Sequence, residues 1–299
     1  MIKTLVCIVG PTAVGKTAMA IKVAKAFDTV ILSADSRQFY QEMTIGTAKP
    51  TAEELAAIPH YFINTLRVQD DYSAGDFERD ALEILEGLFA QHDVVLLVGG
   101  SGLFVNALCY GLDDLPKPVV GTRERLNKVF VESGLGPLQE KLKQVDPEYY
   151  IEVDLQNPQR VIRALEVYES TGKPFSYFRR KQAARRPFNV LKIGLTMDRE
   201  QLYDRINDRV DSMMQQGLLD EVEGLQGYRH RPPLLTVGYV ELFDYLDGRY
   251  SLNTAIEKIK QHTRRYAKRQ LTWFRKDAST RWFLPQDSDQ LIDYIRSTI

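Results

Sequence analysis

Residues 10 to 17 have the types and the spacing of a phosphate-binding loop. They follow the G-x-x-x-x-G-K-[ST] pattern and are Gly10, Pro11, Thr12, Ala13, Val14, Gly15, Lys16 and Thr17. The two glycines allow backbone N–H groups to close around phosphate oxygens, and Lys16 adds a positive charge. The Thr17 hydroxyl can bind Mg2+, which makes Mg2+ the expected cofactor. The loop therefore predicts that the protein binds a phosphorylated ligand.

The segments on either side of this loop are those that the motif needs. Residues 5–9 are an apolar run typical of a buried strand, and residues 18–24 have the apolar spacing of a helix. A strand, a turn and a helix start aim N–H groups and the positive end of the helix at an anion. A chance match in an ordinary strand–turn–helix is the alternative, and the correct context on both sides disfavours it.

Short apolar runs and helical patterns alternate through the first third of the chain. Residues 29–34 and 94–98 read as strands, and residues 76–91 read as an amphipathic helix between them. This alternation predicts an α/β fold with a doubly wound parallel sheet, in which ligands bind at the carboxyl ends of the strands. Because the phosphate-binding loop, Asp35 and Ser101 each follow a strand, we expect them to converge on one crevice.

A helical insertion is predicted to interrupt this α/β pattern. Residues 113–118 read Asp-Asp-Leu-Pro-Lys-Pro, a cluster that breaks regular structure. Beyond it the sequence has only helical patterns until an apolar, strand-like run at 190–195. We therefore predict a core with C-terminal helices, formed by residues 1–112 and 187–299, and a helical insertion of residues 113–186.

Asp35 is the candidate for proton transfer. In many phosphate-loop enzymes, one strand carries the acid that binds magnesium or orients water. The corresponding strand in this sequence is 94–98, and it has no acid after Asp93 at its start. An acid after the preceding strand disfavours a nucleotide hydrolase and favours an enzyme that takes a proton from a bound acceptor. From position alone, Asp35 is equally compatible with capping a helix that starts at Ser36 or Arg37.

Basic residues are concentrated in two segments, although the formal net charge of the chain is −1. The first is the predicted helix 251–276, with one acid after residue 255 and the basic residues Lys258, Lys260, Arg264, Arg265, Lys268, Arg269, Arg275 and Lys276. The second comprises Arg179, Arg180, Lys181, Arg185 and Arg186. Two dense basic runs in a neutral chain favour a nucleic-acid surface over solvated helix faces, with Tyr266 and Trp273 available for stacking.

A further predicted helix, 198–226, carries Arg205 and Arg209 one turn apart. The two side chains could reach a bound phosphate, or they could pair on the surface with Asp204 and Asp208. Position alone favours the surface pairs.

The composition limits the class of protein. In 299 residues, 44% are hydrophobic and 26% are charged, which is typical of a soluble globular protein. No apolar stretch approaches the ~20 residues that span a bilayer, and the N-terminus does not resemble a signal peptide. Cys7 and Cys109 have no metal-type spacing and are expected to be buried thiols. We expect a cytoplasmic protein with no membrane contact.

Six blocks of the sequence together resemble the tRNA-modifying isopentenyltransferase (tRNA dimethylallyltransferase) family. The resemblance runs in the same order over nearly the whole chain, and the last two blocks are the most specific. The blocks are GPTAVGKT at 10–17, ADSRQFY at 34–40, GTAKP at 46–50, LVGGSGLFVNAL at 97–108, NPQRVIRALEVYESTGKP at 157–174 and TRRYAKRQLTWFR at 263–275.

The resemblance implies transfer of a dimethylallyl group from dimethylallyl diphosphate to the exocyclic amine of the adenine adjacent to the anticodon in tRNA, with release of diphosphate. It implies that the loop holds the diphosphate of the donor with magnesium, and that Asp35 is the general base. Ser101 stands at a catalytic position that is usually threonine and keeps the hydroxyl. Arg209 matches the arginine that binds the diphosphate.

The resemblance also implies which residues contact tRNA. They are Ser36, Arg37, Gln38, Gln159, Arg160, Val161, Ile162, Arg163, Arg264, Arg265, Lys268 and Arg269. The insertion and the core would grip the anticodon stem-loop between them, and we expect the protein to be a monomer. Two alternatives stay open: a small-molecule kinase that binds ATP on the same loop, and a non-enzymatic RNA-binding module with a vestigial loop.

Overall fold

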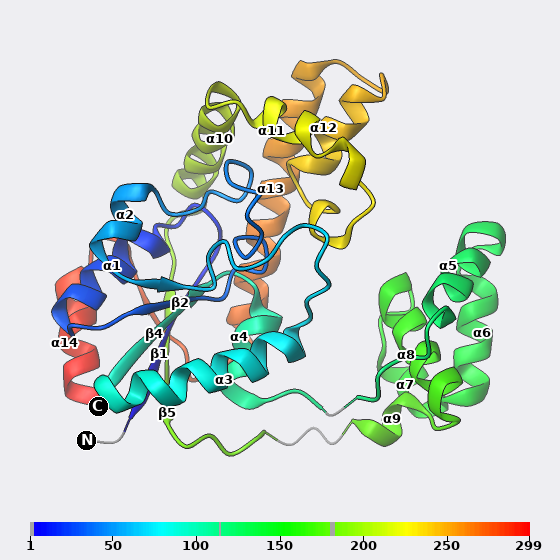
Figure 1. The fold of residues 1–299 in the computed structure, drawn as a ribbon, viewed down its shortest axis with the longest axis horizontal. Coiled ribbons are helices and arrows are strands. Elements are labelled where there is room, and N and C mark those ends of the chain that lie inside the picture. The colour runs from blue at the N-terminus through cyan, green and yellow to red at the C-terminus, as the bar shows by residue number, and fades with distance from the viewer. Residues whose placement is uncertain (1–2, 114, 180–182) are drawn as a thin grey trace. The chain divides into compact units, whose positions relative to one another are not determined.

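A computed structural model describes residues 3–113, 115–179 and 183–299, and these residues form one six-stranded sheet (Figure 1). The strands are β1 Thr4–Val9, β2 Ile31–Ser33, β3 His60–Tyr61, β4 Val94–Gly99, β5 Asn189–Leu195 and β6 Arg281–Phe283. Their order is β3-β2-β4-β1-β5-β6, and every pairing is parallel. The structure confirms the predicted doubly wound parallel α/β fold.

The strands β1 and β4 at the centre of the sheet are buried along their whole length. Alternate β1 residues belong to two different apolar clusters, with Leu5 and Cys7 in one and Val6 and Ile8 in the other. Successive side chains of a strand point to opposite faces of the sheet, so these two clusters cover both faces. Because no side chain of β1 faces solvent, the strand is a continuous apolar run. The predicted burial of Cys7 and Cys109 is confirmed.

Helices cover both faces of the sheet. Ala81 and Leu85 on α3 pack in the cluster of Leu5, while Met19 on α1 and Leu291 on α14 pack in the cluster of Val6. The helices are α1 Lys16–Ala26, α2 Ala52–Ala57, α3 Ala74–Gln91, α4 Gly102–Tyr110, α10 Arg199–Gln215, α11 Leu218–Gly224, α12 Tyr239–Leu246, α13 Leu252–Phe274 and α14 Ser288–Thr298, with short 3-10 turns at Gln226–Tyr228 and Pro232–Leu234.

The single helix expected over residues 198–226 is wrong. The chain forms two helices there, α10 and α11, because Gly217 between them has a φ of +96°. That left-handed conformation ends a helix and is accessible to glycine at little cost. The helix expected over 251–276 is present as α13.

The chain divides into two compact units, residues 1–110 with 185–299, and residues 111–184. The second unit contains α5 Thr122–Ser133, α6 Gly136–Val145, α7 Pro147–Glu152, α8 Pro158–Thr171 and α9 Phe175–Phe178. Its own apolar core includes Leu126, Leu142 and Leu165. Among the described residues of both units, no helix is long and apolar enough to cross a membrane.

Candidate active site at the carboxyl ends of the strands

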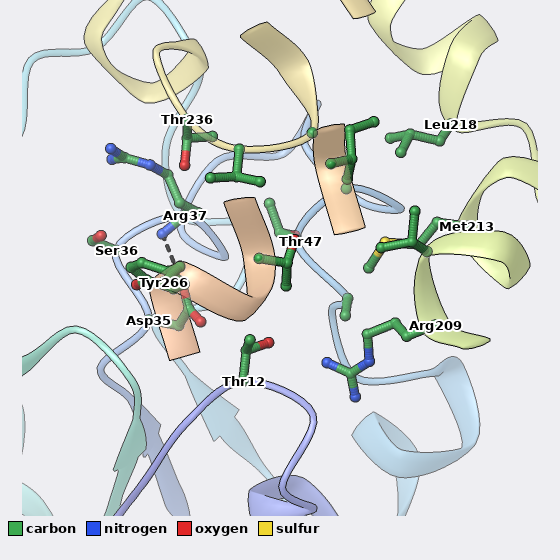
Figure 2. A pocket seen from close by; sticks show the side chains of 17 residues that line it. Thr12, Asp35, Ser36, Arg37, Thr47, Arg209, Met213, Leu218, Thr236 and Tyr266 are labelled. Atoms are coloured by element: carbon green, nitrogen blue, oxygen red, sulfur yellow. Dashed lines mark hydrogen bonds between the residues drawn. The ribbon is translucent and has the colours of Figure 1, made fainter. Parts of the chain in front are cut away.

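A crevice lies at the carboxyl ends of β1 and β2, and several distant segments line it. Thr12, Lys16 and Thr17 come from the phosphate-binding loop and the start of α1, and Asp35 comes from the turn after β2. Arg209 reaches it from α10, on the side opposite Asp35 (Figure 2). The register places Val9 beside Gly99 and Gly194, so the chain leaves adjacent strands at the same edge of the sheet.

Lys16 lies at the first position of α1, against the backbone of its own loop. Its ammonium donates hydrogen bonds to the carbonyl oxygens of Gly10, at 3.1 Å, and Pro11, at 2.8 Å. Burial lowers the pKa of Lys16 to about 8, and the carboxylate of Asp35 partly opposes this shift. The side chains of Pro11, Ala13 and Val14 are buried, so these residues contribute backbone rather than side chains to the loop.

Gln270 of α13 joins two of the loops that form the crevice, and the sequence argument did not identify it. Its Oε1 accepts a hydrogen bond from the N–H of Thr12 at 2.8 Å, and its Nε2 donates to the carbonyl of Gly100 at 2.9 Å. Gln270 is buried on the same face of α13 as Ala267 and Phe274. The sequence does contain a signal for Gln270, because it is a neutral polar residue on the apolar stripe of an otherwise basic helix.

Asp35 lies in a turn, and no helix starts at Ser36 or Arg37. The helix-cap alternative is therefore wrong. The Oδ1 of Asp35 instead accepts a hydrogen bond from the N–H of Arg37 at 3.1 Å, which is an Asx turn. Gly99 permits this geometry, because a Cβ there would lie 2.4 Å from the carbonyl oxygen of Ala34.

Ser101 supports the turn that carries Asp35. Its Oγ accepts a hydrogen bond from the N–H of Ser36 at 3.0 Å and donates one to the Ser36 Oγ at 3.1 Å. These contacts give Ser101 a positioning role through Ser36. A direct catalytic role for Ser101 stays a prediction.

Two arginines of α10 lie on the crevice without a carboxylate partner. Arg205 and Arg209 both line it, and neither forms an ion pair with any of the described residues. The surface pairs with Asp204 and Asp208 that position alone favoured are therefore wrong. Burial lowers the pKa of Arg209, and the neighbouring Arg205 lowers it further. Two unpaired guanidinium groups near Lys16 form a site for an anion with several charged oxygens.

The other end of the crevice is apolar. Met213 and Leu218 lie beyond Arg209, and Thr47 projects between them and Tyr266 (Figure 2). Val210 and Ile259 complete this wall. The crevice thus combines a polar end that suits a diphosphate with an apolar end that suits a small hydrocarbon group.

The family model described as IPP transferase matches residues 38–277. The chain belongs to the IPP transferase family. It is 52% identical over 293 residues to the tRNA dimethylallyltransferase 1 of Bacteroides thetaiotaomicron, covering 98% of this chain and 95% of the relative.

Two solved structures of IPP transferase relatives are also similar. One is the tRNA isopentenylpyrophosphate transferase of Bacillus halodurans, with a TM-score of 0.73 and 38% identity, covering 99% of this chain and 96% of that chain. The other is a eukaryotic dimethylallyltransferase acting on tRNA, with a TM-score of 0.75 and 26% identity, covering 91% of this chain and 69% of that chain.

The loop at residues 44–48 of this IPP transferase is held by one carboxylate. The oxygens of Glu221 accept hydrogen bonds from the N–H groups of Thr44, Ile45 and Gly46 at 2.7–3.0 Å. The fully buried Tyr239 donates its hydroxyl to the same carboxylate at 2.7 Å. Because Thr47 and Ala48 line the crevice, Glu221 positions one of its walls.

We expect Glu221→Gln to lower the free energy of unfolding by about 1–3 kcal/mol and to raise the KM for the substrate that occupies the crevice. The carboxamide presents an NH2 group to backbone N–H groups, so at least one donor loses its partner. Urea denaturation and limited proteolysis within residues 44–48 measure the effect. Glu223→Gln, an exposed change on the same helix, is the control and should behave as wild type. Equal stability of the two variants would contradict the role of Glu221.

The residues expected to contact tRNA divide into exposed and buried groups. Arg265, Lys268 and Arg269 are exposed on α13, while Arg264 donates a hydrogen bond to Asn207 at 2.6 Å. At the start of α8, Gln159 and Arg160 are exposed, and Arg163 forms an ion pair with Glu166. Val161 and Ile162 are buried in the core of the second unit, so their predicted contact with tRNA is wrong.

Two members of the second basic cluster, Arg179 and Arg186, are engaged in contacts within the protein, while Arg185 is exposed. Arg186 donates to Glu78 and to the carbonyls of Ala107 and Leu108, so it fastens the chain where the first unit resumes. Arg179 forms an ion pair with Glu152 at 2.6 Å. Arg180 and Lys181 lie outside the described residues.

Proposed function

We propose that this IPP transferase moves a dimethylallyl group from dimethylallyl diphosphate to the exocyclic amine of the adenine adjacent to the anticodon of a tRNA, and releases diphosphate. The observation that carries the proposal is the crevice that joins a phosphate-binding loop, two unpaired arginines, the carboxylates of Asp35 and Glu54, and an apolar wall. The names of the relatives, which are tRNA dimethylallyltransferases over nearly the full length of this chain, support the same reaction.

The donor is proposed to lie with its diphosphate on the loop and its prenyl group against Met213 and Leu218. The allylic C–O bond breaks as negative charge grows on the leaving diphosphate, and Lys16 and Arg209 stabilise that charge. The Thr17 hydroxyl and the diphosphate oxygens are the hard donors that Mg2+ prefers, and the carboxylate of Glu54 lines the same crevice. Bound there, Mg2+ would neutralise part of the charge of the leaving group.

Asp35 is proposed to be the general base. The lone pair of an adenine amine is delocalised, so the nitrogen becomes a competent nucleophile only as its proton leaves. As the new C–N bond forms at the allylic carbon, the carboxylate accepts that proton. The adenine must leave its stack to reach Asp35, at a cost of a few kcal/mol that contacts of basic side chains with the RNA backbone offset.

The deciding experiment is mass analysis of tRNA nucleosides after incubation with the protein and dimethylallyl diphosphate. A mass gain of one prenyl unit on an adenosine supports the proposal. Parallel incubations with ATP, with and without tRNA, test for a kinase. Phosphate transfer from ATP without prenyl transfer would overturn the proposed function, and so would tight tRNA binding with no product.

We expect kcat/KM for the donor to fall as the pH rises above about 8. Burial places the pKa of Lys16 near 8, so its ammonium is charged below that pH and neutral above it. A diphosphate binds the charged form more tightly, so activity is lost on the alkaline side. A pH series at saturating tRNA measures this. In Lys16→Arg the side chain stays charged, so the alkaline fall should disappear; its persistence would assign the titration to another group.

A further inference from the structure

Trp273 lies on α13 beyond the crevice and is 37% exposed. Its indole packs against the start of α4, where a Cβ at Gly102 would lie 2.2 Å from the Nε1 atom. A large aromatic side chain is thus kept at the surface in a fixed place. A hollow beside it is lined by Asn106, Tyr110 and Lys192, among others.

The floor of this hollow is a rigid polar network. The ammonium of Lys192, which is 4% exposed, donates to Asp277 at 2.9 Å and to Asn106 at 3.1 Å. The hydroxyl of Tyr110 donates to the same Asp277 oxygen at 2.8 Å. Because these side chains satisfy one another, the hollow next to Trp273 is preorganised and does not need to rearrange to receive a flat ligand.

The exposed basic side chains of α13 and the two residues after it, near Trp273, have no acidic partners in the described part of the chain. Near the start of α13, Lys260 forms ion pairs with Asp211 and Glu257. In the second half of the helix and just after it, the exposed basic residues form no such pair; they are Arg265, Lys268, Arg269, Arg275 and Lys276. Unpaired cations of this kind suit phosphate groups.

The surface continues directly from the crevice. Tyr266 lines the crevice near Asp35, where burial and that carboxylate raise the pKa of the phenol to about 12. Trp273 is seven residues, or about 10 Å, further along the helix axis. Between them Arg269 lies over the Tyr266 ring, 5.7 Å from its centroid. Alternating exposed aromatic and basic side chains form the type of surface that binds unpaired RNA bases and their phosphates.

We propose that Trp273 is a stacking platform for an unpaired base of the anticodon loop that neighbours the reactive adenine, with Arg269 and Lys276 on the flanking phosphates. This inference rests on the proposed function, because it assumes that an adenine of that loop enters the crevice. It assigns Trp273 to binding and positioning of the tRNA and not to the bond-making step.

Tryptophan fluorescence tests the contact directly. The chain contains two tryptophans, so Trp282→Phe leaves Trp273 as the single one. We expect an anticodon stem-loop RNA to quench the emission of this variant, because base stacking brings a nucleobase onto the indole. Unchanged emission at saturating RNA, with binding confirmed by filter retention, would overturn the stacking.

Substitution of Trp273 and the use of abasic RNA measure how much the stacking contributes to the affinity for the stem-loop. Trp273→Ala should weaken stem-loop binding by about 5- to 150-fold, the equivalent of about 1–3 kcal/mol, and Trp273→Phe by much less. The KM for the donor should not change. An abasic nucleotide at the stacked position should weaken wild type and leave Trp273→Ala unaffected, which identifies the base. An alanine penalty that persists with every abasic neighbour would overturn the proposal.

These outcomes separate the inference from the proposed function. If wild type prenylates tRNA and Trp273→Ala binds it equally well, the stacking is wrong and the proposed function stands. If Trp282→Phe binds the stem-loop with quenching but wild type forms no prenylated product, the base contact stands and the proposed function is wrong. Circular dichroism melting of each variant shows whether it is folded.

Discussion

Replacing Asp35 with asparagine is expected to slow dimethylallyl transfer by about 10²- to 10⁴-fold while donor and tRNA affinities stay unchanged. Asparagine keeps the oxygen that accepts the hydrogen bond from Arg37, so the turn after β2 persists. It cannot accept the proton of the adenine amine. Single-turnover transfer, with tRNA bound in advance and the reaction started by the donor, isolates this step from binding.

A matched substitution far from the crevice controls for the loss of one negative charge. Asp293 is exposed on α14, so Asp293→Asn should transfer at the wild-type rate. Transfer by Asp35→Asn at the wild-type single-turnover rate would remove Asp35 from the role of base. A parallel loss of tRNA affinity would assign it to the binding surface instead.

Lys16→Ala is expected to reduce transfer by about 10²- to 10³-fold and to weaken the donor more than the tRNA. The ammonium lies where the charge of the leaving diphosphate develops, and a methyl group cannot replace it. Calorimetric titration with dimethylallyl diphosphate and filter binding of tRNA measure the two affinities separately. Lys25→Ala, an exposed change in the last turn of α1, is the control and should alter neither affinity. Equal losses of donor and tRNA affinity would mean that the loop is only structural.

Local sequence patterns determined the frame of the molecule. The strand β1, the phosphate-binding loop and the helix α1 follow one another directly in the sequence. Residues close in the chain therefore specify all three. The same holds for α3, whose first turn has a reciprocal hydrogen-bonded cap from Ser73 and Asp76. Fold class and the position of the phosphate-binding loop could therefore be predicted.

Other predictions depended on contacts that no local pattern specifies. The family resemblance placed Val161 and Ile162 in a segment expected to contact tRNA, but their burial depends on packing against Leu126, Leu138 and Leu142 from two other helices. The surface pairs expected for Arg205 failed because α10 turns that side chain toward the crevice instead.

The sequence by itself predicted a phosphate-binding loop after the first strand and determined that a carboxylate follows the second. Only the tertiary structure decided what surrounds that loop. The N–H of Thr12 meets its partner Gln270 across 258 positions of the chain, and Glu221 holds the loop at Gly46 across 175. The apolar wall likewise joins residues of α10, α11 and α13. Such pairings follow from how helices and loops pack around the sheet, and this long-range geometry leaves no repeating signal in the sequence.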